Sequence, residues 1–144
     1  MFDHDYFMKQ ALNEAVIAGE EGEVPIGAVV VCGEKIIARA HNQTEMLNDV
    51  TAHAEMLAIT AASGFLGGKY LTDCTLYVTV EPCVMCAGAL AWAQIACVVY
   101  GAHDEKRGFS RYAPGAMHPK TKIIDGVLEK ECADLIMQFF ITKR

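Results

Sequence analysis

The sequence predicts an α/β protein with a three-layer α/β/α sandwich around a mixed five-stranded sheet. Two observations predict this fold: segments with helical periodicity alternate with short β-branched runs, and one strand–helix–strand unit is long enough for a parallel crossover. A hairpin in the first third of the chain adds an antiparallel pair, so we expect a mixed sheet. The 144 residues are 53% hydrophobic, and we expect a single domain over residues 1–144.

The expected elements follow from apolar spacing and from glycine and proline breaks. Apolar residues recur at helical spacing in the first segment and run almost uninterrupted in the strands expected to be buried. Gly64 is expected to end the second helix, and Pro82 is expected to open the third at its first position. In chain order we expect a helix over 6–18, strands over 24–31 and 35–40, a helix over 51–62, a strand over 75–80, a helix over 83–94, a strand over 97–101, a loop with a helical turn over 102–118, a short edge strand over 122–124 and a helix over 129–143.

Composition limits the class of protein. Twelve basic and 18 acidic residues give a net charge of −6, which argues against a broad basic face for nucleic acid but not against a local basic patch. No run of 18 apolar residues occurs, and the N-terminus has no signal-peptide pattern. We expect no membrane association and a cytoplasmic location, with Cys32, Cys74, Cys97 and Cys132 as free thiols.

Two short motifs carry the chemistry. A β-branched run ends at Pro82 and is followed by Cys83 and Cys86, and His53 lies 30 residues before the first cysteine. Two thiolates at a helix N-terminus and one imidazole form a typical zinc ligand set. Three protein ligands leave one tetrahedral position for water, which is the pattern of a catalytic zinc and not of a four-ligand structural zinc. A core histidine with two apolar-site thiols, or a redox pair, is the alternative.

Glu55 follows His53 by two residues and is the candidate catalytic base. Two thiolates cancel the formal charge of Zn²⁺, so the metal alone should acidify its water less than an all-imidazole site would, and a nearby base would help. A surface carboxylate on a helix is the alternative interpretation. A further alternative is a non-catalytic zinc protein, in which the site serves folding only. Glu55 argues against this class, because a structural zinc site needs no unliganded carboxylate beside an open coordination position.

The order His-x-Glu and then Pro-Cys-x-x-Cys resembles the signature of the zinc-dependent nucleobase deaminases. Three longer stretches, Asp49–Glu55, Leu76–Ala89 and Val99–Lys106, closely resemble the bacterial tRNA adenosine deaminases. The resemblance runs from about Tyr6 to Arg144. It implies a cytidine deaminase-like fold, one Zn²⁺ per subunit, a homodimer, and a tRNA anticodon loop as the partner.

The resemblance also implies substrate contacts. Asn42 corresponds to an asparagine that helps to hold the target nucleoside, and Val24, Pro25 and Ala54 correspond to pocket walls. A turn residue and core packing are the respective alternatives. For RNA the resemblance points to Asp104, Lys106, Phe140 and Arg144, with one phenylalanine of the 139–140 pair in the core and the other free to stack on an unpaired base. Solvated surface charges are the alternative for the basic residues.

These observations predict zinc-dependent hydrolytic deamination of the wobble adenosine of tRNA to inosine, with the base flipped out of the anticodon loop. The alternative is a deaminase of a free base or nucleoside, of guanine or cytosine type, that uses the same zinc chemistry. The net charge of −6 favours that alternative, whereas the C-terminal phenylalanine pair and the loop lysine favour RNA.

Overall fold

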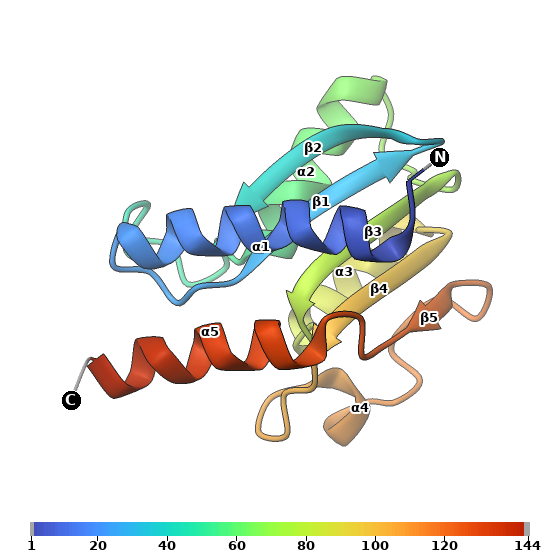
Figure 1. Cartoon of the computed structure of the whole chain (residues 1–144). Helices are drawn as coiled ribbons and strands as arrows, with labels where there is room; N and C mark the ends of the chain where they lie inside the picture. The colour runs from blue at the N-terminus through green and yellow to red at the C-terminus, as the bar shows by residue number, and fades with distance from the viewer. Residues whose placement is uncertain (1, 143–144) are drawn as a thin grey trace.

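The computed structural model describes residues 2–142 and builds them around one twisted sheet (Figure 1). In chain order the elements are α1 (His4–Glu20), β1 (Gly27–Cys32), β2 (Lys35–His41), α2 (Ala54–Leu66), β3 (Cys74–Val80), α3 (Val84–Ala93), β4 (Cys97–Ala102), α4 (Phe109–Tyr112), β5 (Lys122–Ile124) and α5 (Glu129–Thr142).

The sheet is mixed, as the sequence predicts. Its strands lie in the order β2-β1-β3-β4-β5, five in all within residues 2–142. The hairpin partner β2 and the neighbour β3 are both antiparallel to β1, whereas β3, β4 and β5 run parallel. The connection from β3 through α3 to β4 is therefore the expected parallel crossover.

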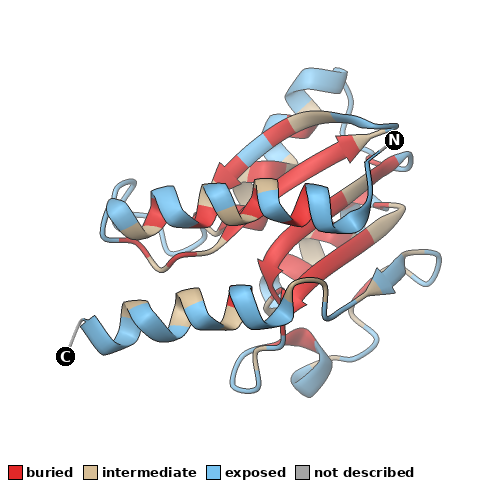
Figure 2. Ribbon diagram, in the orientation of Figure 1, coloured by how far each residue is buried: buried red, intermediate tan, exposed pale blue. Residues whose placement is uncertain are grey.

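Helices cover both faces of the sheet and complete the three layers (Figure 1). On one face, Ala58 of α2 and Leu90 of α3 belong to the same buried cluster as Val78 of β3. On the other face, Met8 of α1 and Cys132 of α5 belong to a second cluster. Cys132 is the only residue of α5 that is buried within the described range, and the later turns of this helix are largely exposed (Figure 2). The apolar face expected for the last helix is thus only half covered.

The second helix begins and ends later than its sequence predicts. His53 has an extended backbone with φ −73° and ψ 153° and is the N-cap, so the first helical residue is Ala54 and not Thr51. The helix continues through Gly64, and Gly67 ends it with a left-handed φ of 72°. The prediction that Gly64 stops the helix is wrong because a glycine weakens a helix without breaking it, whereas a left-handed residue cannot continue it.

Two further boundaries differ around prolines. Cys83, with φ −73° and ψ 174°, is the N-cap of α3, so Pro82 lies before the helix and not at its first position. Strand β1 begins at Gly27 rather than at Val24, because the Ile26 N–H donates to the Val24 carbonyl oxygen at 2.8 Å in a tight turn around Pro25.

No helix within residues 2–142 combines the length and the apolar composition needed to cross a bilayer. All six cysteines lie in the described range and are free of disulfide bonds.

A close approach between α1 and β1 fixes one face of the sheet. A Cβ atom on Gly27 would lie 2.1 Å from the Ala11 carbonyl oxygen and 2.4 Å from the Ala15 nitrogen. Both neighbours are backbone atoms of α1, so neither can turn aside as a side chain could. The small residues Ala11 and Ala15 are completely buried at this contact.

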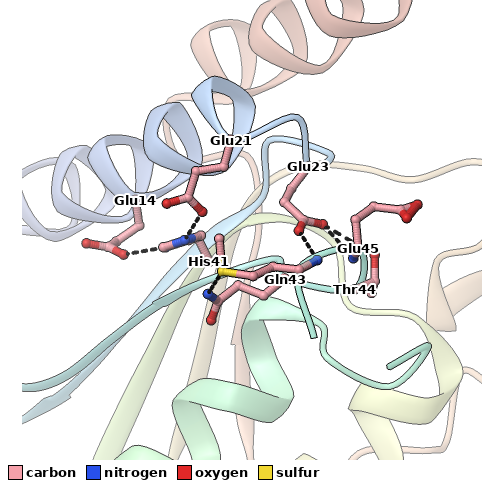
Figure 3. Close-up of polar contacts among 8 residues, drawn as sticks. Glu14, Glu21, Glu23, His41, Gln43, Thr44 and Glu45 are labelled. Atoms are coloured by element: carbon pink, nitrogen blue, oxygen red, sulfur yellow. Dashed lines mark hydrogen bonds and ion pairs between the residues drawn. The ribbon is translucent and has the colours of Figure 1, made fainter. Parts of the chain in front are cut away.

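A second link between α1 and the sheet is ionic. His41, at the end of β2, places Nδ1 3.0 Å from Glu14 Oε1 and Nε2 3.0 Å from Glu21 Oε1 (Figure 3). Burial by itself lowers the pKa of His41, but the hydrogen bonds to the two carboxylates and their charges outweigh burial and raise the pKa above 6.5.

We predict that Gly27→Ala destabilises the protein, because the added methyl group forces backbone atoms apart. The expected loss in the free energy of unfolding is about 1–3 kcal/mol or more. The matched control is Gly64→Ala in the interior of α2, where a Cβ meets nothing within 4 Å. That change should stabilise the protein by up to about 1 kcal/mol. Urea denaturation followed by circular dichroism measures both, and equal effects of the two variants would contradict the packing account.

The His41 contacts should make stability depend on pH. Because the folded pKa is raised above the unfolded value, the stabilisation is fully present below pH 6.5 and is lost as the pH rises through the folded pKa. His41→Gln should therefore reduce the free energy of unfolding by about 1 kcal/mol near pH 6 and by clearly less near pH 8.5. Urea midpoints of the two proteins at both pH values measure this, and a difference independent of pH would refute it.

Candidate metal centre

Three potential metal ligands converge where α2 and α3 begin. His53 is the N-cap of α2, Cys83 is the N-cap of α3, and Cys86 lies in the first turn of α3. The His53 Nδ1 atom lies 3.6 Å from the Cys83 Sγ atom and 3.5 Å from the Cys86 Sγ atom. All three ligand atoms lie within 4.8 Å of one another. This group can hold a metal ion.

The topology explains why residues 30 positions apart meet. Helix α2 follows the hairpin, helix α3 follows β3, and both pack on the same face of the sheet in contact with each other. Each helix therefore brings its N-terminus to the same region. A helix N-terminus favours negative charge, and this is the charge that thiolate ligands carry.

The two sulfur atoms and the His53 imidazole form a hydrogen-bonded group that carries one thiolate. A hydrogen bond from Cys86, together with one from His53, lowers the pKa of Cys83 to about 4. The same bond to Cys83, together with burial, raises the pKa of Cys86. The hydrogen bond to Cys83 also raises the pKa of His53. The group therefore holds a thiolate at neutral pH, and a thiolate is the metal-binding form of cysteine.

Glu55 is buried beside these ligands. It lies in the first turn of α2 and is only 4% exposed. Burial is the main cause that raises the pKa of its carboxyl to about 7. A hydrogen bond from its own backbone N–H lowers this pKa, and the negative charge of Cys83 raises it. The side chain is close enough to Cys86 for a hydrogen bond. A buried carboxyl beside a metal-ligand group can hold or release a proton there.

Asn42 has an unusual environment. It directly follows β2 and is 7% exposed, and its backbone N–H donates to the Ile26 carbonyl oxygen at 3.0 Å. Its side-chain Oδ1 atom is buried and has no hydrogen-bond partner within residues 2–142. An unpaired buried acceptor is costly, so it marks a place where a ligand donor would be accommodated.

The other three residues expected at the substrate pocket lie in different surroundings. Ala54, the first residue of α2, is completely buried. Val24 lines a cavity of about 380 Å³ together with Glu23, Glu45 and Phe140. Pro25 lines a neighbouring cavity of about 300 Å³ between α1 and α5. Neither of these two cavities is lined by a metal-site residue.

The residues expected to contact RNA fall into two groups. Asp104 and Lys106 lie in the segment after β4, where Asp104 Oδ1 accepts hydrogen bonds from the N–H groups of Lys106 and Arg107. Phe140 lies on α5 and is 52% exposed. Arg144 lies outside the described residues.

Two further carboxylates are buried. Glu23 was not among the residues selected from the sequence, whereas for Glu81 the sequence leaves a role beside the ligands and a polar residue at a strand end as alternatives. Glu23 is 1% exposed and accepts hydrogen bonds from the backbone N–H groups of Glu45 and Met46 (Figure 3). Glu81 is 4% exposed and stands between β3 and Pro82. A charged residue directly before an apolar run is the signal that could have identified Glu23.

Known proteins with this sequence pattern are deaminases. The family model of the MafB19-like deaminases matches residues 2–144. The tRNA-specific adenosine deaminase of Agrobacterium fabrum is 44% identical over an alignment that covers 100% of this chain and 98% of the relative. This chain belongs to the tRNA-specific adenosine deaminase family.

Solved structures agree with the family. One, from a study of A-to-I editing by tRNA:A34 deaminases at the wobble position of transfer RNA, superposes with a TM-score of 0.84 at 45% identity and covers 90% of this chain and 97% of its own. The guanine deaminase of Bacillus subtilis superposes with a TM-score of 0.68 at 42% identity. This alignment covers 71% of the present chain and 66% of the guanine deaminase chain.

We predict that the deaminase binds one divalent metal ion per chain through the three converging ligands. Cys86→Ser should lower metal affinity at least tenfold, since one of three ligands is lost. Cys97→Ser, a half-buried strand thiol outside the group, is the matched control and should retain the ion. Elemental analysis after dialysis against a weak chelator measures this, and equal metal contents in the two variants would contradict the assignment.

Proposed function

We propose that this chain is a zinc-dependent hydrolytic deaminase that converts the wobble adenosine of tRNA to inosine and releases ammonia. The observation that carries the proposal is the meeting of His53, Cys83 and Cys86 beside the buried carboxyl of Glu55, in a chain of the tRNA-specific adenosine deaminase family.

The spacing of the ligand atoms supports zinc. Zinc–sulfur bonds of about 2.3 Å and zinc–nitrogen bonds of about 2.0 Å at a tetrahedral angle separate nitrogen from sulfur by about 3.5 Å. The two nitrogen–sulfur distances here are 3.6 and 3.5 Å. Within residues 2–142 no fourth His, Cys, Asp or Glu side chain belongs to this group, so a fourth protein ligand is not at hand. Zinc bound by these residues would lower the pKa of a water, so that the water loses a proton readily and becomes a nucleophile toward an electrophilic ring carbon.

Glu55 is proposed to carry the protons of the reaction. It would take one proton from the attacking water and deliver it to the ring nitrogen beside C6. It would then take the second proton from the hydroxyl group now bonded to C6 and pass it to the amino group, which leaves as ammonia as the C6–N bond breaks and the C6 carbonyl forms. Water adds one oxygen to C6 and the base loses its exocyclic nitrogen, so adenosine and water give inosine and ammonia. Burial of Glu55 supports this role, because a buried carboxyl is shielded from exchange with bulk water.

Asn42 is proposed to orient the target nucleoside. Its unpaired Oδ1 atom can accept a hydrogen bond from a base N–H or a ribose hydroxyl. Ala54 is proposed as a wall of the pocket, since a small buried residue between His53 and Glu55 leaves room for a ring.

RNA is proposed to be the substrate rather than a free base. Lys106 and Arg107 are exposed on a turn that Asp104 shapes, and Phe140 presents an exposed ring on α5. Exposed cations contact phosphates, and an exposed aromatic ring stacks on unpaired bases. The likeness to a guanine deaminase and the net charge of −6 favour the alternative, a deaminase of free bases or nucleosides.

The same proposal includes a single domain over residues 1–144, a homodimer with an RNA site built from both subunits, and a cytoplasmic location. Helix α3 leaves Val84 and Met85 partly exposed and Trp92 83% exposed, which supports a covering partner. A second copy also extends the surface available to RNA.

Glu55→Gln should abolish deamination while leaving the metal and the fold in place. The amide cannot take a proton, so we expect a loss of at least about 100-fold in kcat with unchanged zinc content. Glu34→Gln, an exposed carboxylate in the β1–β2 turn, is the matched control and should retain full activity. Retained activity in Glu55→Gln, or loss of its zinc, would refute the role of Glu55.

Substrate choice is tested by ammonia release from two sets of substrates. We expect the zinc-loaded protein to turn over an anticodon stem-loop with adenosine at the wobble position and to leave free guanine, adenosine and cytosine untouched. Turnover of a free base with the stem-loop unchanged would support the alternative and make the exposed cations ordinary surface residues.

A further inference from the structure

Glu81 is a buried carboxylate that no step of the proposed chemistry uses. It stands directly after β3 and two residues before the ligand Cys83. Its Oε1 atom accepts a hydrogen bond from the Asp104 N–H at 3.1 Å. Its Oε2 atom accepts one from the Ser110 N–H at 3.0 Å and a second from the Ser110 hydroxyl. One side chain thus binds the segment 104–111 near both of its ends.

Backbone contacts bring the same segment onto the metal-ligand turn. The Phe109 N–H donates to the Pro82 carbonyl oxygen at 2.9 Å, and Cys83 forms an isolated β-bridge with Gly108. Gly108 must be glycine here, since a Cβ atom would lie 2.4 Å from the Glu81 carboxyl carbon. The segment is therefore packed directly against the carboxylate and against a metal ligand.

The segment presents positive charge. Lys106, Arg107 and Arg111 are exposed on it, within a chain whose net charge is −6. Asp104 orders the turn through the N–H groups of Lys106 and Arg107, and Arg111 donates to the Glu105 carbonyl oxygen at 3.2 Å. Because Asp104 is itself held by Glu81, the position of these cations depends on the buried carboxylate.

Only a carboxylate satisfies this arrangement. Three donors point at two oxygen atoms, and each carboxylate oxygen can accept more than one hydrogen bond. A glutamine would place its NH₂ group against either the Asp104 N–H or the two Ser110 donors. A change of Glu81 to Gln therefore keeps the shape but loosens one end of the segment.

We propose that Glu81 is a positioning residue that sets the cationic segment 104–111 at a fixed place relative to the metal centre. Phosphates of a single-stranded RNA loop are then held by the segment while the target base reaches the metal. This inference rests on the proposed function, because it assigns the segment to the same substrate.

The test compares Glu81→Gln and the milder Ser110→Ala with the wild-type protein and with Glu34→Gln, which makes the same charge change at an exposed site. Ser110 is exposed, so its truncation should not prevent folding. Four quantities are measured on zinc-loaded protein: zinc content, kcat for the stem-loop, KM for the stem-loop, and the hydrogen-exchange rate of a peptide spanning residues 103–112.

We expect Glu81→Gln to raise KM about tenfold, the size of effect typical of a lost hydrogen bond to a charged group, with kcat within about twofold. Zinc content should not change, exchange over 103–112 should become faster, and Ser110→Ala should show the same pattern more weakly. A lower kcat at unchanged KM, a loss of zinc, or no change in any quantity would overturn the inference.

If the wild-type protein deaminates no RNA, the proposed function fails, and the exchange rate decides the positioning role alone. Faster exchange in Glu81→Gln than in Glu34→Gln then supports a segment held by Glu81, and equal rates overturn it.

Discussion

The convergence of two helix N-termini is the constraint on which the rest of the structure depends. His53 and Cys83 both have extended backbones as N-caps, and Cys86 lies in the turn that follows. Each helix must therefore begin at the residue that supplies a ligand, and both must pack on one face of the sheet. The order of the strands provides this, since the hairpin leads to α2 and the parallel crossover begins with α3. A metal site assembled this way needs no dedicated loop.

The buried carboxylates of this structure have two different roles. Glu23 and Glu81 are held by backbone N–H donors from distant segments, so each fixes a loop. Glu55 lies instead in the first turn of α2 beside the ligands and is in hydrogen-bond reach of Cys86. A carboxylate saturated by fixed donors is suited to hold structure, whereas one beside an ion is suited to move a proton. In the proposed reaction Glu81 positions the segment that holds the substrate, and Glu55 acts on the substrate.

Much of this could be predicted from the sequence because the relevant signals are local. Alternating helical and strand periods give the layers, and the spacing of His53, Cys83 and Cys86 gives the ligand set. Helix starts were less predictable. The pattern predicts a helical Thr51, but Thr51 lies in a turn and His53 is extended, so the helix begins at Ala54 and the imidazole faces the thiols. The hydrogen-bond partners of Glu23 and Glu81 were not predictable, since these donors lie 22 to 29 positions away in segments without a long periodic pattern.

The most direct test of the account is anomalous X-ray scattering at the zinc absorption edge from crystals of the metal-loaded protein. The account predicts one peak per chain within bonding distance of His53 Nδ1, Cys83 Sγ and Cys86 Sγ, with a fourth position that no protein atom fills. A fourth protein ligand would mean a closed structural site, and a peak elsewhere would mean that the ligand assignment is wrong. Either result would contradict a catalytic zinc held between the two helices.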